Sequence, residues 1–356
     1  MRILLTGGGT AGSVSPLLSI YSALKAQYPD GDFLFIGTRF GNPEKEMVRG
    51  QHITYRSIFS GKFRRYFDFR NISDIFLLLI GFVQSLFIIY SFKPDLIISA
   101  GSFVSVPVIW AGWAWQRKIL IHQQDIRPSL SNILTMRLAT AITVSFKDSL
   151  KYFPPKKSIY TGNPARFSAD RQSVIIPSDL HDRPILLCIG GGTGSVFINS
   201  FVSRNIAELT SRYRVIHIAG QDKIPPVTAN QWYRCISFVT DEMGQILKKA
   251  DMVLSRAGLS TLTELSALGK AAIVIPLPHS HQEDNARYFA ERHAIIHMDQ
   301  DSTTDKQLLQ AIHELMSDQG ARDKLSKSIS VVMKKDSLSG MMKVINGILG
   351  YGAPKN

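Results

Sequence analysis

The sequence predicts an α/β protein with two domains, each a doubly wound parallel sheet covered by helices on both faces. The chain has 356 residues, which suggests two domains of about 150 to 200 residues. Short apolar runs alternate with longer segments of helical period almost throughout, and this pattern is typical of repeated strand–helix–strand units. Each half opens with a hydrophobic strand, a glycine-rich turn and a helix. The two halves are therefore expected to share one architecture.

The strands are expected where the short apolar runs lie. These runs cover 2–6, 33–37, 53–57, 95–99, 118–122 and 141–145 in the first half, and 184–189, 213–218, 235–239, 251–255, 271–275 and 294–297 in the second. Between the two series, Thr161-Gly162-Asn163-Pro164 leads into a polar, irregular stretch that reaches Arg183. Such a composition is typical of a linker. We therefore place a first domain at 1–163 and a second at 164–336.

Composition excludes several classes of protein. Hydrophobic residues make up 45% of the chain and charged residues 19%, which excludes intrinsic disorder. The net charge of +13 favours anionic partners such as nucleotides, nucleic acid or acidic lipid, without choosing among them. Cys188 and Cys235 form no Cys-x-x-Cys pair, so neither a disulfide framework nor structural zinc is expected. The opening run Met1–Thr6 is too short for a signal peptide, and we expect a cytoplasmic protein.

One segment departs from the pattern of a soluble protein. Residues 75–89 are apolar nearly all round, but they fall short of the roughly 20 residues that a membrane span needs, and Gln84-Ser85 interrupts them. Just upstream, basic and aromatic side chains alternate from Lys62 to Arg70. This arrangement suits a surface that rests on anionic lipid. A buried core helix behind a solvated basic loop explains the segment equally well.

The first glycine-rich turn, Gly7 to Gly12, contains a literal Gly-x-Gly-x-x-Gly pattern. Such a turn can bring backbone amides to a phosphate and lead into a helix N-terminus. A dinucleotide-binding domain would also carry an acid at the end of the second strand to bind ribose hydroxyls. That strand ends Ile36-Gly37-Thr38-Arg39 without one. Hydride transfer is therefore a minor alternative.

The second turn, Gly190 to Ser195, could hold a diphosphate through backbone amides and the dipole of the following helix, or it could be only a tight connection. Further along, Glu264 follows the strand at 251–255, where ribose hydroxyls would be bound. Thr261-x-x-Glu264 also matches a helix capping box. A glycine turn in each half suggests a nucleotide-sugar enzyme with an anionic acceptor.

Several further motifs occur in one order along nearly the whole chain. At these residues the sequence resembles the peptidoglycan N-acetylglucosaminyltransferases, which are nucleotide-sugar glycosyltransferases of the GT-B class. The matching segments are Gly8 to Gly12 with Pro16, 61–66, 93–95, 101–107, 122–125, 162–166 and 255–286. A set of motifs in the right order is far more specific than a single glycine turn.

The resemblance implies a GT-B fold with two Rossmann-like domains facing a cleft, and a last helix, around Ser337–Leu349 within 337–356, that returns to the first domain. It implies transfer of N-acetylglucosamine from UDP-GlcNAc to the 4-hydroxyl of a MurNAc-pentapeptide on undecaprenyl diphosphate, with inversion. The protein would act as a peripheral protein at the cytoplasmic face of the plasma membrane. The residues in contact with the anionic membrane surface would be Lys62, Arg64, Arg65, Phe76 and Phe82. No cofactor and no nucleic-acid partner are implied.

The resemblance also implies roles for individual residues. On the donor side, Glu264 would hold the ribose, Arg166 and the turn the diphosphate, Thr240 the uracil, and Gln282 with Asn285 the sugar. His281 is either a sugar contact or a solvated loop residue. The turn residues of the donor side are Gly191, Gly192, Thr193, Gly194 and Ser195. The acceptor side would use Gly9, Thr10, Ala11, Gly12, Ser102 and Ser105.

Three departures from the family pattern affect the expected chemistry. Ser13 stands in place of a histidine that is the favoured candidate for acid/base work, and a serine hydroxyl is far too weakly acidic for a general base. Gln123 replaces an acid, and Gly192 replaces a serine of the donor turn. His122 and Asp125 remain as the pair that could deprotonate an acceptor hydroxyl. They could equally be a core histidine and a helix-capping aspartate.

Two rival functions stay open at this level. One is a weakly active or non-enzymatic homologue that keeps the donor site, and the other is a related transferase with a different acceptor. Asp30-Gly31-Asp32 and Asp299-Gln300-Asp301 match the Asp-x-Asp pattern of metal-dependent transferases, but their positions indicate solvated turns. We therefore expect no required metal.

Overall fold

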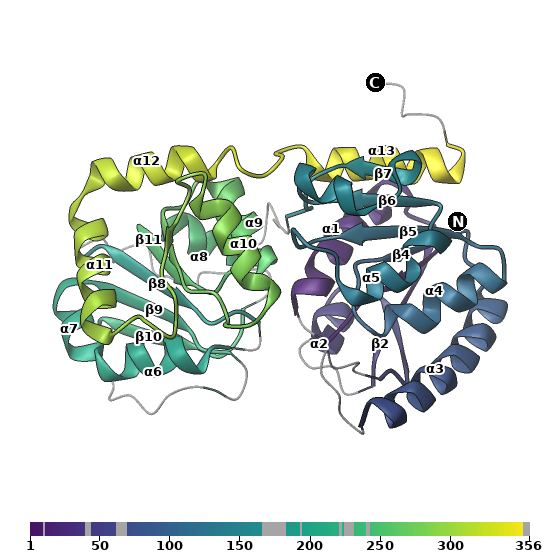
Figure 1. Cartoon of the computed structure of the whole chain (residues 1–356), viewed down its shortest axis with the longest axis horizontal. Coiled ribbons are helices and arrows are strands. Elements are labelled where there is room, and N and C mark those ends of the chain that lie inside the picture. The colour runs from purple at the N-terminus through teal and green to yellow at the C-terminus, as the bar shows by residue number, and fades with distance from the viewer. Residues whose placement is uncertain are drawn as a thin grey trace. The chain divides into compact units, whose positions relative to one another are not determined.

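The computed structural model describes residues 1–9, 11–39, 44–61, 70–165, 183–192, 194–220, 223, 231–239 and 243–351. The chain divides into two compact units, Met1–Ala165 with Asp336–Asn356, and Arg166–Lys335 (Figure 1). Each unit contains one parallel sheet with its helices, so the predicted fold class of two doubly wound parallel-sheet domains is confirmed.

The first unit contains a seven-stranded sheet in the order β3-β2-β1-β4-β5-β6-β7. Its strands are β1 (Arg2–Thr6), β2 (Asp32–Thr38), β3 (Thr54–Ile58), β4 (Leu96–Ser99), β5 (Lys118–Gln123), β6 (Ala141–Val144) and β7 (Ser158–Tyr160). Its α-helices are α1 (Ala11–Gln27), α2 (Glu44–Arg49), α3 (Arg70–Phe92), α4 (Ser105–Ala114), α5 (Leu130–Thr135) and α13 (Ser337–Leu349). Short 3₁₀ segments lie at Met136–Leu138, Lys147–Tyr152 and Pro155–Lys157.

The last helix, α13, belongs to the first unit although it follows the second in sequence. Tyr28 donates a hydrogen bond from its hydroxyl to Asn346 Oδ1 at 3.1 Å, and Lys118 donates from Nζ to the Ile348 carbonyl at 2.6 Å. Met341 and Ile345 on the same helix are fully buried. Apolar burial and these two hydrogen bonds together fix α13 on the first unit.

The second unit contains a six-stranded sheet in the order β10-β9-β8-β11-β12-β13. Its strands are β8 (Ile185–Ile189), β9 (Arg214–Ile218), β10 (Tyr233–Ile236), β11 (Met252–Ser255), β12 (Ala272–Val274) and β13 (Ile296–His297). Its helices are α6 (Val196–Arg204), α7 (Ile206–Arg212), α8 (Met243–Lys249), α9 (Leu259–Leu268), α10 (His281–Ala290), α11 (Asp305–Ser317) and α12 (Gln319–Ile329). One core cluster joins strand residues such as Leu186 and Leu254 to Phe201 of α6 and Ile312 of α11.

Most of the predicted strands are confirmed to within one or two residues, because central parallel strands are buried on both faces and read as continuous apolar runs. Two expectations were wrong in detail. The predicted strand at 235–239 lies two residues earlier, as β10, and the edge strand β7 was not predicted. β7 is only three residues long, and its Ile159 is exposed, so it carries no apolar run.

The apolar segment at 75–89 lies within α3, which is longer than predicted. Its part from Asp74 to Phe92 is long and apolar enough to cross a membrane by length and composition, but only 22% of it is buried. Leu78, Ser85 and Ile89 form its buried face.

Phe82 turns toward α4, with its ring centroid 6.5 Å from that of Trp110. The opposite face is exposed at Ile75, Phe76, Leu79, Ile80, Val83, Phe87 and Tyr90. The interpretation as a fully buried core helix is therefore wrong.

Candidate functional site

In each sheet the strand order reverses between two central strands, and ligands of open parallel sheets bind outside the carboxyl ends of such strands. In the first unit these strands are β1 and β4, and in the second they are β8 and β11. Each glycine turn predicted from the sequence directly follows β1 or β8. The structure therefore brings both turns to the position that favours ligand binding.

In the first unit the glycine turn after β1 meets the loop after β4. Gly9 has a φ of +82°, and a Cβ at this position would lie 3.8 Å from Ser102 Oγ. Ser102 itself has a φ of +82°, which is unusual for a residue other than glycine and indicates local strain. Ala11 and Gly12 lie in the first turn of α1, with their backbone amides at the helix N-terminus. Thr10 lies outside the described residues.

Ser105 and Ser13 support this turn and its neighbouring loop from within. Ser105 is fully buried and donates from Oγ to the Gly101 carbonyl at 2.6 Å, so it holds the loop. The expectation that Ser105 contacts the acceptor substrate does not fit this burial. Ser13 donates from Oγ to the Gly8 carbonyl at 2.9 Å. The residue that stands in place of the family histidine is therefore tied to the glycine turn.

His122 lies at the end of β5 with no exposed surface. Its Nδ1 lies 3.0 Å from Thr143 Oγ1, and its Nε2 lies 2.9 Å from Asn163 Oδ1. Burial lowers its pKa from 6.5 to about 4, although both hydrogen bonds oppose the shift. The ring is neutral near pH 7 and has both nitrogens engaged. This geometry favours a structural histidine over a catalytic one.

Gln123, the replacement for the family acid, is also buried. Its Nε2 donates to the carbonyls of Asp125 at 2.8 Å and Arg127 at 2.9 Å, and its Oε1 accepts from Asn132 Nδ2 at 2.7 Å. A carboxylate could not donate to the two carbonyls. Gln123 therefore fixes the loop that carries Asp125, which is itself half-buried.

In the second unit the turn after β8 is built around two glycines with positive φ, Gly191 at +84° and Gly194 at +72°. A Cβ on Gly194 would collide with the Ala219 carbonyl, so only glycine fits there. Ser195 is the N-cap of α6 and accepts from the Ile198 amide at 3.3 Å. Gly192 is half-buried, and Thr193 lies outside the described residues, as do Arg166 and Thr240.

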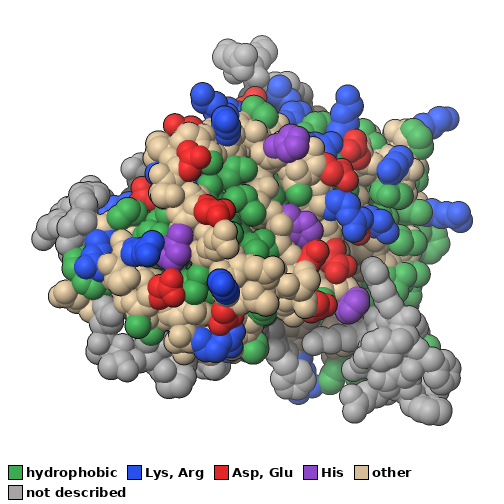
Figure 2. Space-filling view, turned by 60° about the vertical axis from the view of Figure 1, so that its left-hand side comes forward, with side chains coloured by type: hydrophobic (Ala, Val, Ile, Leu, Met, Phe, Trp, Pro, Cys, Tyr) green, Lys and Arg blue, Asp and Glu red, His purple; other side chains and the backbone are tan. Residues whose placement is uncertain are grey.

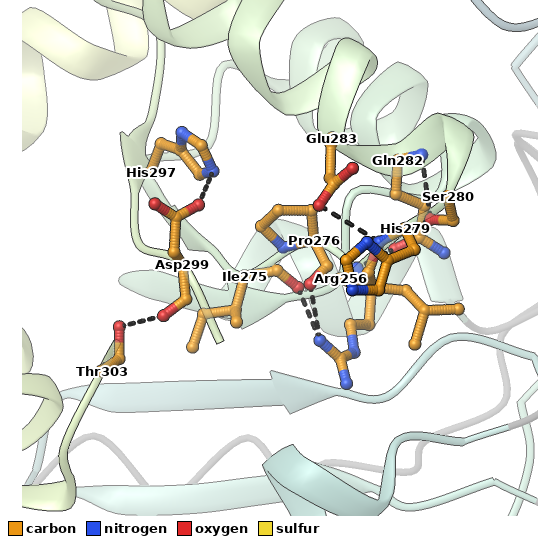
Figure 3. A network of polar contacts seen from close by, with 11 residues as sticks. Arg256, Ile275, Pro276, His279, Ser280, Gln282, Glu283, His297, Asp299 and Thr303 are labelled. Atoms are coloured by element: carbon orange, nitrogen blue, oxygen red, sulfur yellow. Dashed lines mark hydrogen bonds and ion pairs between the residues drawn. The ribbon is translucent and has the colours of Figure 1, made fainter. Parts of the chain in front are cut away.

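Arg256 joins the turn after β8 to the loops after β11 and β12, and sequence reasoning did not single it out. Only 7% of it is exposed. It donates from Nη1 to the carbonyls of Ile275 at 3.1 Å and Pro276 at 2.9 Å (Figure 3). It also donates from Nε to Ser195 Oγ at 2.9 Å and from Nη2 to Gln300 Oε1 at 2.6 Å. Burial lowers its pKa. Among the described residues its acceptors are all neutral, so the guanidinium places an unbalanced positive charge beside the turn.

Glu264 lies in the second turn of α9, half-buried. The helix begins at Leu259 with Gly258 as its N-cap, so Thr261 is not a cap and the capping-box interpretation of Glu264 is wrong. Asn285 is fully buried and its Nδ2 lies 3.4 Å from the Ala257 carbonyl. It therefore supports the loop after β11, and no exposed surface remains for a sugar.

Gln282 and His281 start α10, close to the network around Arg256. Gln282 accepts from the Leu277 amide at 3.1 Å, and Ser280 caps the helix, as Figure 3 shows. Gln282 is half-buried and His281 is exposed, so both keep surface that a ligand could contact. Within the described residues, no group of three or more His, Cys, Asp or Glu side chains could hold a metal ion. Asp299 of the Asp-x-Asp match instead pairs with His297 at 3.2 Å.

Charges on the surface are mixed. On the face drawn in Figure 2, acidic and basic side chains are interspersed, with hydrophobic side chains scattered between them. The net charge of +13 is therefore not gathered into one uniform patch on that face.

Comparisons with known proteins agree with this geometry. Residues 3–144 match the glycosyltransferase family 28 N-terminal domain, and residues 185–339 match the family 28 C-terminal domain. A protein of Bacillus cereus named "UDP-N-acetylglucosamine--N-acetylmuramyl-(pentapeptide) pyrophosphoryl-undecaprenol N-acetylglucosamine transferase 2" is 35% identical over 88% of this chain and 91% of its own. A protein of Lachnospira eligens with the same name, without the numeral, is 34% identical over 97% and 98%.

Among solved structures, the crystal structure of Acinetobacter baumannii MurG superposes with a TM-score of 0.72 at 22% identity, covering 97% of this chain and 99% of that one. This likeness shows a shared fold. The sequence identity to the two curated relatives, over most of both chains, shows the family as well as the fold. The chain therefore belongs to the MurG-type N-acetylglucosaminyltransferases of glycosyltransferase family 28.

Proposed function

We propose that this protein transfers N-acetylglucosamine from UDP to the 4-hydroxyl of the N-acetylmuramyl-pentapeptide carried on undecaprenyl diphosphate, with inversion at the anomeric carbon. The observation that carries the proposal is the glycine turn at the reversal point of each sheet, in a chain whose relatives are named for N-acetylglucosamine transfer to this acceptor. The donor nucleotide would bind the second unit and the lipid-linked acceptor the first.

The reaction is a direct displacement. The acceptor hydroxyl attacks the anomeric carbon, the bond to the UDP phosphate oxygen breaks, and the hydroxyl proton passes to a base. Negative charge develops on the departing diphosphate. The amide of Gly191, the N-terminus of α6 and the buried Arg256 would supply positive charge at that place, and such preorganised charge is usually the largest contribution to catalysis.

Asp125 is our candidate for the base, because it is half-buried in a loop that Gln123 fixes. On the donor side, Glu264 would bind the ribose, and Gln282 with His281 the sugar. Arg166, Thr193 and Thr240 would complete the donor site.

The decisive experiment is UDP release by the full chain with the lipid-linked muramyl-pentapeptide acceptor. The proposal expects release that depends on both substrates and a product with one added N-acetylglucosamine. UDP-GlcNAc binding without release would favour the weakly active homologue, to which Ser13 and Gln123 point. Release with another acceptor alone would favour the related transferase.

We further propose that the protein works as a peripheral protein at the cytoplasmic face of the plasma membrane, with the exposed face of α3 on the lipid. Apolar patches of this kind on soluble proteins mark interaction sites. Trp113 and Trp115, exposed at the end of α4, lie near this face, since the Trp115 ring is 5.1 Å from that of Tyr90. The buried face of α3 keeps the helix on its unit, so it would lie on the lipid instead of crossing it. Lys62, Arg64 and Arg65 lie outside the described residues.

Sedimentation with anionic vesicles tests this second proposal. Phe76 is 63% exposed and Phe87 is 71% exposed, so replacing both by serine should lower partitioning at least tenfold. Val331→Ser is the control, because Val331 is 74% exposed in the segment between α12 and α13. Equal partitioning of the parent, the double variant and the control would contradict the proposal that α3 contacts the membrane.

A further inference from the structure

A carboxylate lies buried against the glycine turn of the first unit. Glu44 begins α2, and only 1% of it is exposed. Its Oε2 accepts a hydrogen bond from the Gly9 amide. Its Oε1 accepts from the Thr38 amide at 2.5 Å, and from the hydroxyls of Thr38 and Tyr55 at 2.8 Å each. One side chain thus joins the turn after β1, the end of β2 and the strand β3.

Two glycines make room for this carboxylate. A Cβ on Gly8 would lie 2.5 Å from Glu44 Oε2, and a Cβ on Gly37 would lie 2.7 Å from Glu44 Oε1. Both distances are far below van der Waals contact. The glycines of the turn and of the β2 end therefore serve the approach of Glu44, in addition to any approach of a ligand.

Glu44 occupies the position that an anion takes at such a turn. In strand–glycine turn–helix units, the turn amides and the helix N-terminus usually bind a phosphate. Here the chain supplies its own anion to the Gly9 amide. Burial and the charge of Glu44 both raise the pKa of Tyr55, which keeps its hydroxyl protonated as a donor.

We propose that Glu44 is the positioning residue of the acceptor-side turn. Its carboxylate fixes Gly9 and with it the start of α1, and it keeps the acceptor's diphosphate off the Gly9 amide. The diphosphate then binds at the N-terminus of α1. The fixing of the turn follows from the structure alone, whereas the identity of the bound anion rests on the proposed function.

Glu44→Gln tests the proposal with little change in size. The amide group has one oxygen where Glu44 has two, so its NH₂ must face either the Gly9 or the Thr38 amide. One of the two bonds is lost and the turn is released. Glu46→Gln is the matched control, since Glu46 is exposed on the same helix.

The first readout is hydrogen exchange of the full chain, followed by mass spectrometry of peptides covering 7–13. Exchange at Gly9 should become at least tenfold faster in Glu44→Gln and stay unchanged in Glu46→Gln. Unchanged exchange in Glu44→Gln would overturn the proposal. This readout does not depend on activity.

The second readout is steady-state kinetics. In Glu44→Gln we expect the KM for the lipid-linked acceptor to rise at least tenfold, with the KM for UDP-GlcNAc within twofold of the parent. Faster exchange with an unchanged acceptor KM would overturn the positioning role. A parent chain without any transferase activity would contradict the proposed function and leave the exchange result standing.

Tyr55→Phe covers the case in which Glu44→Gln does not fold. It removes a hydroxyl whose one proton is shared between Glu44 Oε1 at 2.8 Å and the Thr38 carbonyl at 2.7 Å, and it keeps the carboxylate. We expect exchange at Gly9 and the acceptor KM to change in the same direction by about two- to threefold. No change in either quantity would then overturn the proposal.

Discussion

Arg256 donates a hydrogen bond from Nε to Ser195 Oγ at 2.9 Å, and this contact joins the ends of two neighbouring strands, β11 and β8. The same guanidinium holds the carbonyls of Ile275 and Pro276. The planar guanidinium fork donates from three separate nitrogens to four acceptors, whereas an ammonium has only three donors, all on one atom. Arg256 therefore organises the turn after β8 and adds charge beside it.

Arg256→Lys should keep the charge and lose the fork. Two or more buried acceptors would be left without a donor, so we expect the free energy of unfolding to fall by about 2 kcal/mol and the Kd for UDP-GlcNAc to rise several-fold. Denaturant unfolding and calorimetric titration measure the two quantities. Arg234→Lys, at an exposed arginine of β10, is the control and should change neither. An equally stable Arg256→Lys variant would show that the fork is dispensable.

Glu264→Gln should weaken UDP-GlcNAc binding by roughly 1 to 3 kcal/mol, the cost of removing a charged acceptor from ribose hydroxyls. Because Glu264 also makes a contact within the chain, the thermal stability of the variant is measured beside its affinity. Calorimetric titration with UDP-GlcNAc, with Glu291→Gln as an exposed control, measures the effect. Unchanged affinity in the folded variant would remove Glu264 from the ribose site.

The two glycine turns could be predicted from the sequence, because each lies within one short segment after a continuous apolar run. Glu44 and Arg256 could not. Glu44 meets Gly9 from 35 residues away, and Arg256 meets Ser195 from 61 residues away. A charged residue in a local pattern usually indicates a solvated position, and only the folded chain shows that these two are buried.

The nearest available signal for Glu44 was the absence of an acid at the end of the second strand. The structure supplies a carboxylate to that strand end from the start of the next helix, six residues after Thr38. This carboxylate accepts hydrogen bonds from backbone amides and hydroxyls of the chain itself. It therefore does not match the pattern of an acid that binds ribose at the end of the strand. For His122 the sequence left a core histidine and a base equally open, because its partners Thr143 and Asn163 lie far away in sequence.

The burial of His122 predicts a pH dependence of stability. Its pKa is about 4 in the folded chain, below the value of 6.5 for the unfolded one, so the unfolded chain binds more protons between these values. Stability is therefore fully present above pH 6.5 and falls as the pH drops toward 4, by about 3 kcal/mol from this group. Buried His217, with a pKa also about 4, should add a loss of the same sign.

His122→Gln separates the two contributions. Glutamine can bond both Thr143 and Asn163 but does not titrate, so the loss between pH 6.5 and 4 should become smaller. Urea unfolding followed by tryptophan fluorescence suits the measurement, because Trp110, Trp113 and Trp115 all lie in the first unit with His122. An identical pH dependence in the parent and the variant would contradict the assignment.

Gln123→Glu, which restores the acid of the family pattern, should harm this chain. A carboxylate would face the carbonyls of Asp125 and Arg127 without a proton to donate, and we expect a loss of about 1 to 3 kcal/mol of stability. Turnover should fall as well, because the loop that carries Asp125 is released. The exposed Gln116→Glu is the control for the change in charge. A stable and more active Gln123→Glu variant would show that the loop needs an acid and not the amide.

Ser13→His tests whether the chain lacks an acid/base group. If the histidine of the family pattern assists proton transfer, its absence costs on the order of 10²- to 10⁴-fold in turnover, and restoring it should raise turnover with little change in UDP-GlcNAc affinity. The substitution also removes the bond from Ser13 Oγ to the Gly8 carbonyl. Ser13→Ala measures that loss alone and should lower stability by about 1 kcal/mol without raising turnover. A brisk parent rate that Ser13→His does not improve would place the base elsewhere, and Asp125→Asn should then abolish turnover while UDP-GlcNAc binding persists.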